Sequence, residues 1–168
     1  WLSMANPPFP NLNSERALLL YPSLCLFDGT LMSQGRGTCA PFTVLGHPGL
    51  KGRYQFSFTP VSTPGMSEHP PYEGQPCYGL NLDTVLLADL LSGPRLNLSW
   101  LLQLYRDFPD KTGFFNPDKF DRLAGTVGLR QQILAGTDER TIRQSWEPAL
   151  ASFKQKRKQY LLYETDDD

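Results

Sequence analysis

Histidine and cysteine are scarce in this sequence. Among its 168 residues there are two histidines, His47 and His69, which are not at the spacing of a zinc motif. We therefore expect no bound metal and no cofactor. The three cysteines also lack a metal-binding spacing. The three are Cys25, Cys39 and Cys77, and because their number is odd at least one thiol is unpaired. A disulfide between Cys39 and Cys77 is possible.

The chain also lacks an excess of either charge and any long apolar run. The chain has 16 Lys and Arg and 17 Asp and Glu, which gives a net charge of -1. This balance removes the usual electrostatic argument for a nucleic-acid partner or an anionic membrane. No apolar run has the length of a membrane span, and no signal-peptide pattern is present. Because the chain begins at Trp1, we expect a fragment of something longer.

Hydrophobic residues make up 40% of the chain, enough for a packed core and a single domain. Residues 1–16 are rich in Pro and Asn and are interpreted as a linker or a covering loop from a missing N-terminal domain. Short strands are predicted at 42–45, 54–59 and 78–83, the last two from alternation of apolar and polar residues. Between them, residues 60–71 form a long Pro-rich loop, of a length often used for binding.

Helices are predicted mainly in the second half. One short helix starts earlier, capped by Asn13 or Ser14 and running to Tyr21. Later helices are expected from Asn97, from the Asn116 cap, over residues 129–135, and from a Ser145 cap. Residues 164–168 are an acidic tail. Strands and irregular loops in the first half, with helices in the second, predict an α+β domain over residues 17–163.

One glycine-rich stretch carries the polar groups best suited to a site. Asp28 is followed by Gly29 and Thr30, and further on Arg36 stands between two glycines and before Thr38. Glycine allows a sharp bend and close approach of other groups. Apolar segments on both sides can bury and hold the stretch. The alternative is a surface turn with a solvated arginine, since glycine-rich loops are common.

Several blocks of the sequence resemble the exo-β-N-acetylmuramidases of the NamZ type, which were long classed as a domain of unknown function. The similar blocks run in order along nearly the whole chain, and they include residues 21–30, 35–38, 41–42, 46–48, 58–61, 77–80, 98–101, 108–111, 120–126 and 157–163. Two positions depart from the family pattern. Asp28 and Gln34 stand where many members carry Glu, which favours binding over proton transfer for this loop.

The resemblance implies a glycosidase that removes N-acetylmuramic acid from the non-reducing end of peptidoglycan fragments. Members have two domains with the site in the cleft between them, and this chain resembles the C-terminal half. The principal catalytic carboxylate is then expected in the missing N-terminal domain, which is also a partner. Muropeptides or disaccharides from peptidoglycan are the expected ligands. The implied location is periplasmic or secreted.

Within this chain, Asp28 is the best-placed carboxylate for catalysis; the alternatives are that it binds a sugar hydroxyl or anchors the turn through Arg36. Arg36 is the candidate partner for the lactyl carboxylate of the muramic sugar, because the planar guanidinium can bind both oxygens. The alternative is an internal ion pair. His47 could bond a sugar hydroxyl or fix a turn. The further substrate-binding candidates, some of which could be core and rim residues instead, are Thr30, Thr38, Tyr72, Glu73 and Tyr78.

Two other classes of function stay open on the sequence. A carbohydrate- or wall-binding module would bind muropeptides without any chemistry. A structural domain that mediates assembly would bind no sugar.

Overall fold

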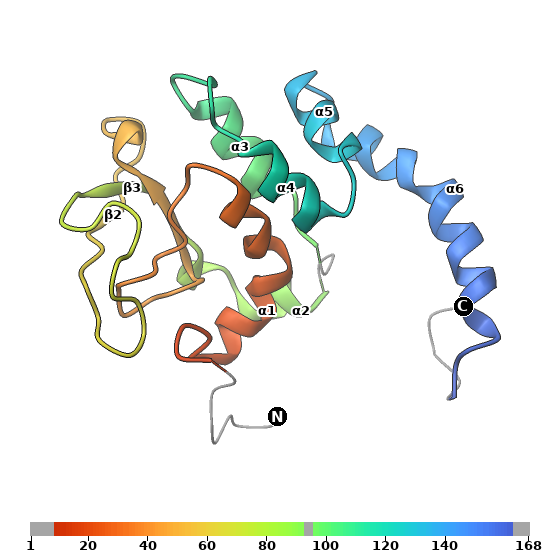
Figure 1. Cartoon of the computed structure of the whole chain (residues 1–168), viewed down its shortest axis with the longest axis horizontal. Coiled ribbons are helices and arrows are strands. Elements are labelled where there is room, and N and C mark those ends of the chain that lie inside the picture. Colours follow the sequence, from red (N-terminus) through yellow and green to blue (C-terminus); the bar gives the residue numbers. More distant parts are fainter. Residues whose placement is uncertain (1–8, 93–95, 163–168) are drawn as a thin grey trace. The chain divides into compact units, whose positions relative to one another are not determined.

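The computed structural model describes residues 9–92 and 96–162 (Figure 1). The chain divides into two compact units, residues 1–130 and 131–168. Each unit is described by itself below. Within the described ranges there are six α-helices and a three-stranded sheet, so the predicted α+β class is confirmed.

The first unit opens with helix α1, Glu15–Leu24, followed by the 3₁₀ helix η1, Cys25–Gly29. Ser14 caps α1 as predicted, since its Oγ accepts a hydrogen bond from the Ala17 amide at 3.1 Å. The helix continues through Pro22, past the predicted end at Tyr21. A proline this close to the end costs few backbone bonds, and buried Leu20 and Leu24 hold the last turns in place.

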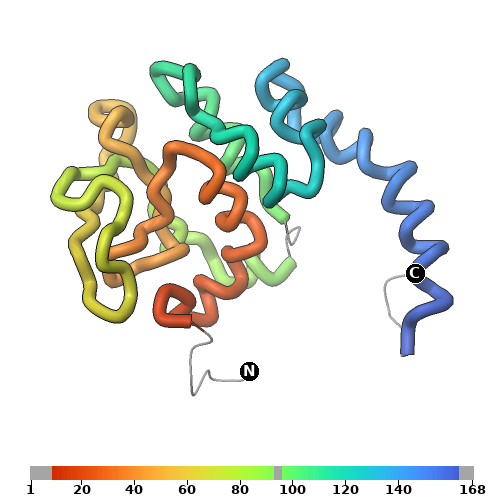
Figure 2. The backbone as a smooth tube through the Cα atoms, in the orientation of Figure 1, coloured from red at the N-terminus to blue at the C-terminus, as the bar shows by residue number. Residues whose placement is uncertain are grey.

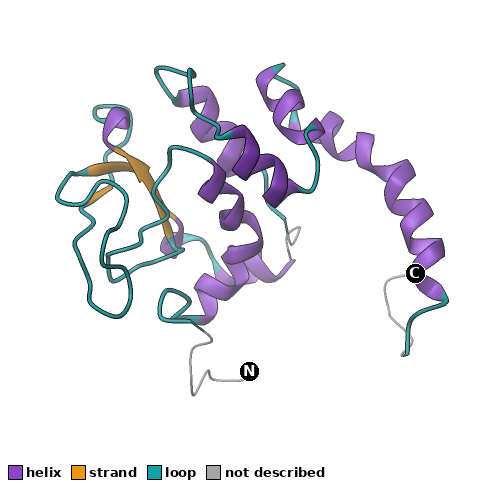
Figure 3. Cartoon of the chain, viewed as in Figure 1, coloured by secondary structure: helices purple, strands orange, loops and turns teal. Residues whose placement is uncertain are grey.

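The sheet consists of β1 (Val44–His47), β2 (Ser57–Phe58) and β3 (Cys77–Asn81) in the antiparallel order β1-β3-β2. Figure 3 shows the strands among long loops. All three predicted strands exist, but the one at 54–59 is reduced to two residues. Tyr54 instead forms an isolated β-bridge with Lys51, and its hydroxyl donates to Asp107 Oδ2 at 2.6 Å.

Helices complete the first unit. The short elements η2 (Pro48–Leu50), η3 (Leu82–Thr84) and α2 (Leu87–Ser92) precede the longer α3 (Ser99–Asp107) and α4 (Pro117–Ala124). The sequence patterns do not predict α2. The Asn116 cap of α4 is confirmed, since Asn116 Oδ1 accepts from the Lys119 amide at 3.1 Å. The fully buried side chains include Phe27, Phe42, Phe114, Phe120, Leu20, Leu24, Leu45, Leu98 and Leu104.

Helix α5, Gly128–Leu134, spans the boundary between the units, and the second unit then holds α6, Glu139–Lys158. The predicted cap at Ser145 is wrong. Asp138 caps the helix by accepting from the Thr141 amide at 3.0 Å, and Ser145 lies inside it with its hydroxyl donating to a backbone carbonyl. Residues 1–8 of the predicted linker and the acidic tail at 164–168 lie outside the described residues.

The Cys39–Cys77 disulfide that the sequence left open is not formed. Cys25, Cys39 and Cys77 are all free thiols, with Cys39 exposed and Cys77 buried. Across residues 9–92 and 96–162, no group of three His, Cys, Asp or Glu side chains could hold a metal ion. In the same ranges no helix combines the length and the apolar character needed to cross a membrane.

Candidate functional site

Asp28 is placed by close packing between η1 and helix α4. A Cβ on Gly29 would lie 2.5 Å from Phe120 Cα, so only glycine lets the helix approach this closely. The Asn116 amide donates to the Gly29 carbonyl at 2.9 Å, and the Leu31 amide donates to the Phe114 carbonyl at 3.0 Å. These bonds fix the backbone on the C-terminal side of Asp28.

Arg36 stands between two glycines that no other residue could replace without strain. Gly35 and Gly37 have φ of 74° and 75°, which side chains rarely adopt. A Cβ on Gly35 would also lie 2.5 Å from Val44 Cγ2, and one on Gly37 would lie 2.5 Å from the Val61 carbonyl oxygen. The backbone of Arg36 is therefore held from both sides. In Figure 2 the backbone around Arg36 runs beside the loop of residues 60–76.

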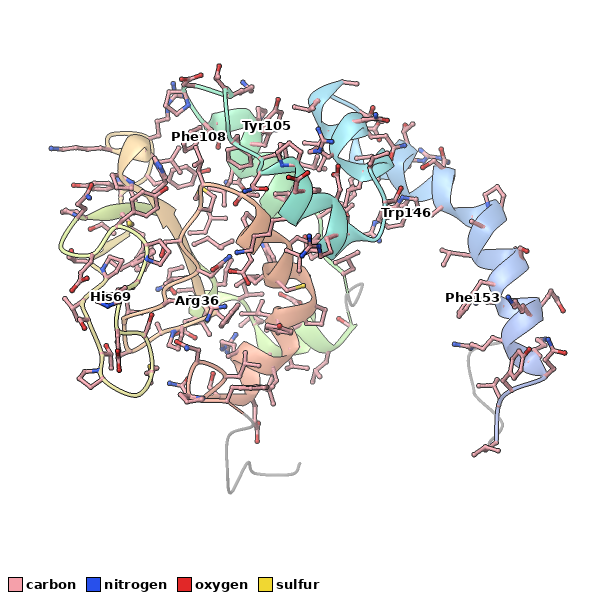
Figure 4. All side chains as sticks on the ribbon, viewed as in Figure 1. Arg36, His69, Tyr105, Phe108, Trp146 and Phe153 are labelled. Atoms are coloured by element: carbon pink, nitrogen blue, oxygen red, sulfur yellow. The ribbon has the colours of Figure 1, made fainter. Side chains whose placement is uncertain are left out.

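The side chain of Arg36 turns toward Asp28 and Phe42. Its Nη2 donates to Asp28 Oδ2 at 3.4 Å, and its guanidinium carbon lies 4.7 Å from the centroid of the Phe42 ring. The Arg36 side chain is 31% exposed and that of Asp28 is 26% exposed. Among the described residues, Asp28 is the only hydrogen-bond partner of this guanidinium. Figure 4 labels Arg36, whose guanidinium carries further N–H donors that no described residue uses.

Thr30 and Thr38 use their hydroxyls to shape the loop. Thr30 Oγ1 donates to the Phe27 carbonyl at 2.9 Å and accepts from the Met32 amide at 3.1 Å. Thr38 Oγ1 donates to the Gly35 carbonyl at 2.6 Å and accepts from the Ala40 amide at 3.1 Å. Both hydroxyls are engaged within the protein, so we assign them a structural role and leave sugar binding by them as a prediction.

His47 ends strand β1 and fixes the turn after it. Its Nδ1 accepts from the Gly49 amide at 2.8 Å, which leaves the proton of the neutral ring on Nε2. The ring meets Tyr72 and Phe108 edge-on, with centroids 4.7 and 4.8 Å away. Burial lowers the pKa of His47 below its ordinary value. The imidazole is thus a neutral N–H donor at neutral pH.

The long loop predicted at 60–71 is tied to the loop that carries Arg36. The Val61 amide donates to the Gly37 carbonyl at 2.8 Å, and Tyr72 Oη donates to the Leu31 carbonyl at 2.6 Å. Glu73, just after the loop, accepts through Oε1 from the Ser62 amide near its start at 3.2 Å. We call this loop the strap, because hydrogen bonds attach it at several points to the rest of the first unit. Tyr72 and Glu73 therefore sit at one end of this strap.

Tyr78 lies opposite His47 in the β1–β3 register, and residues opposite each other in an antiparallel pair share a face of the sheet. The structure thus joins Asp28 with Arg36, and joins His47 with Tyr72 and Tyr78. It adds Phe42 and Phe108, which the sequence does not single out as site residues. Phe42 has a φ of 58°, and nothing in a phenylalanine predicts that conformation.

A family model described as "Exo-beta-N-acetylmuramidase NamZ, C-terminal" matches residues 19–163. The chain belongs to this family. It is 32% identical to the peptidoglycan beta-N-acetylmuramidase NamZ of Bacillus subtilis (strain 168), over 93% of this chain and 40% of that protein. The membership expected from the sequence is confirmed.

A solved relative has the same fold. The crystal structure of a DUF1343 family protein from Bacteroides fragilis NCTC 9343 matches with a TM-score of 0.87 and 40% identity. The match covers 95% of this chain and 44% of that chain. The chain therefore spans less than half the length of either relative, and it is a domain related to peptidoglycan muramidases.

Proposed function

We propose that this chain is the substrate-binding part of a glycoside hydrolase that removes N-acetylmuramic acid from the non-reducing end of peptidoglycan fragments. The name of the Bacillus relative supports the activity class. The single observation that carries the proposal is the setting of Arg36. Its guanidinium is partly exposed, rests against Phe42 and has a single, long bond to Asp28.

That setting suits the carboxylate that distinguishes a muramic sugar from other amino sugars. A guanidinium presents a planar fork of donors, which binds both oxygens of a carboxylate at once. A charge-assisted hydrogen bond is ordinarily about 2.7–2.9 Å long. The 3.4 Å bond to Asp28 is longer, so Arg36 can take a second carboxylate without losing a strong internal pair.

The second group of side chains, around His47, also suits a sugar. His47 offers an N–H from Nε2 to a hydroxyl or to the acetamido oxygen, and the rings of Tyr72 and Tyr78 can pack against a sugar face. In this proposal Asp28 anchors Arg36 and does not act in proton transfer. Cleavage of a glycoside uses two carboxyl groups. The principal one then belongs to an N-terminal domain of the parent chain, and the parent protein acts in the periplasm or outside the cell, where peptidoglycan is found.

A synthetic muramoside with a chromogenic leaving group tests this proposal. The full-length parent protein should hydrolyse it, and the present chain alone should bind it without turnover. The matched substrate is the corresponding N-acetylglucosaminide, which lacks the lactyl group and should be a much poorer ligand. Strong turnover by the present chain alone would contradict the proposed place of the principal carboxylate.

The second candidate is a wall-binding module without chemistry. One observation favours it: Asp28 is the only carboxylate between residues 28 and 38, and it is paired with Arg36. This candidate predicts that the chain binds muropeptides and that neither the chain nor the parent protein hydrolyses them.

A further inference from the structure

Two non-glycine residues among those described have a positive φ, and both are aromatic. Phe42 has a φ of 58° and Tyr72 a φ of 60°. Bulky L-residues rarely adopt this region, because the side chain crowds its own backbone. Such strain persists only where the surrounding structure holds it, and it gathers at binding sites. Each of these residues touches a side chain of the candidate site.

Phe42 is held firmly in its strained conformation. Its amide donates to the Gln34 carbonyl at 2.8 Å, and the residue is 2% exposed. Tyr21 of helix α1 packs edge-on against that ring, with centroids 5.3 Å apart. The ring cannot move far without disturbing α1. It therefore forms a fixed surface beneath the Arg36 guanidinium, 4.7 Å from its central carbon.

The same relation recurs at Tyr72. Its hydroxyl is anchored on the Leu31 carbonyl, and its ring supports His47 at 4.7 Å. In both cases a strained aromatic residue from a different segment supports a polar side chain. An arginine loses considerable rotamer freedom when it binds, so a surface that already orders it improves affinity.

We propose that Phe42 is a positioning residue that holds the Arg36 guanidinium in one orientation, with the donors not used by Asp28 presented to an anionic sugar. The inference deepens the function proposed above and depends on it for the identity of the ligand. The long bond to Asp28 is too weak to orient the side chain alone. The attraction between the cation and the ring supplies the second restraint.

The order of the Arg36 side chain can be measured without any ligand. In a ¹⁵N-labelled sample, the Arg36 Nε–H signal should have a heteronuclear NOE close to backbone values and a shift displaced by the ring current. Arg36→Lys identifies the signal by its loss. Arg53, which is exposed, serves as the mobile reference within the same protein. An Arg36 signal as mobile as that of Arg53 would overturn the proposal.

The variants Phe42→Leu and Phe42→Tyr separate the ring from simple apolar bulk. Phe42→Leu should make the Arg36 signal mobile and reduce the preference for N-acetylmuramic acid over N-acetylglucosamine by about 10-fold. Phe42→Tyr keeps the ring and should retain both properties. An ordered Arg36 in folded Phe42→Leu would overturn the inference. If the wild-type chain binds neither sugar, the proposed function is wrong. The Nε–H measurement needs no ligand, so it still tests whether Phe42 orders Arg36.

Discussion

The Asp28 carboxylate and the Arg36 guanidinium are joined by a single hydrogen bond, from Nη2 to Oδ2, at 3.4 Å. The two residues lie at opposite ends of a loop whose backbone is fixed by glycines and by helix α4. For Arg36 the sequence left three readings open: a partner for the ligand carboxylate, an internal ion pair, and a solvated arginine in a surface turn. Because the bond is long and leaves other guanidinium donors unused, Arg36 can pair with Asp28 and also bind a ligand carboxylate.

Asp28→Asn tests whether Asp28 only anchors Arg36 or also transfers a proton. The substitution removes a negative charge beside the proposed position of the ligand carboxylate, so N-acetylmuramic acid should bind as well or up to about 5-fold more tightly. Titration calorimetry measures the affinity. N-acetylglucosamine, which has no carboxylate, should be unaffected. Unchanged binding combined with loss of turnover in the parent protein would instead assign catalysis to Asp28.

Gly37→Ala should be more destabilising than Gly65→Ala. Both glycines have a positive φ, which costs about 1 kcal/mol for alanine. At Gly37 the new Cβ would also lie 2.5 Å from the Val61 oxygen and 2.6 Å from Pro70 Cγ, whereas Gly65 has no atom within 4 Å. The clash adds about 1–3 kcal/mol. Urea unfolding of both variants measures the difference in their stability. Equal losses of stability would show that the strap does not pack closely against Gly37.

Gln34→Met should stabilise the chain. Gln34 is 3% exposed, and its Nε2 has no hydrogen-bond partner among the described residues. A buried donor without a partner costs about 1–3 kcal/mol, and methionine has a similar length without that donor. The matched control is Gln103→Met, since Gln103 Nε2 donates to the Tyr54 hydroxyl at 3.2 Å. The urea midpoint should rise for the first variant and fall for the second; a fall for both would show that the Gln34 amide has a partner in solution.

His47 should make the stability depend on pH. Burial lowers its pKa below 6.5 in the folded chain, so the unfolded chain binds the proton first as the pH falls. The stability from neutral His47 is complete above 6.5 and is lost as the pH falls toward the folded pKa. Urea midpoints between about pH 7.5 and 5 measure the slope.

Two variants assign that slope. His47→Gln should flatten it, and His69→Asn, at an exposed histidine, should leave it as in the wild type. A slope that survives His47→Gln would show that other groups cause the acid sensitivity.

The sequence predicts those features that short-range bonds decide. Asn116 followed by proline starts a helix because its side chain caps the Lys119 amide, and this depends on neighbours alone. Ser145 also looks like a cap, but Asp138 already starts the helix further upstream. Choosing between two such caps depends on where the helix packs, which a local pattern does not contain.

Much of the site depends on contacts between distant segments. The glycines around Arg36 signal a sharp bend, and His47 before proline and glycine signals the turn that its Nδ1 fixes. Phe42 gives no such signal, because its positive φ is imposed by the Gln34 carbonyl and by helix α1. The contact of Tyr72 with Leu31 joins residues 41 positions apart, so it is also absent from any local pattern.

The central claim is that Arg36 recognises the carboxylate of a muramic sugar. Its most direct test is the ratio of the dissociation constants for N-acetylglucosamine and N-acetylmuramic acid, measured for the wild-type chain and for Arg36→Ala. We predict that the wild type prefers N-acetylmuramic acid by about 10-fold or more and that Arg36→Ala loses this preference while remaining folded. A preference that survives in folded Arg36→Ala would contradict the account.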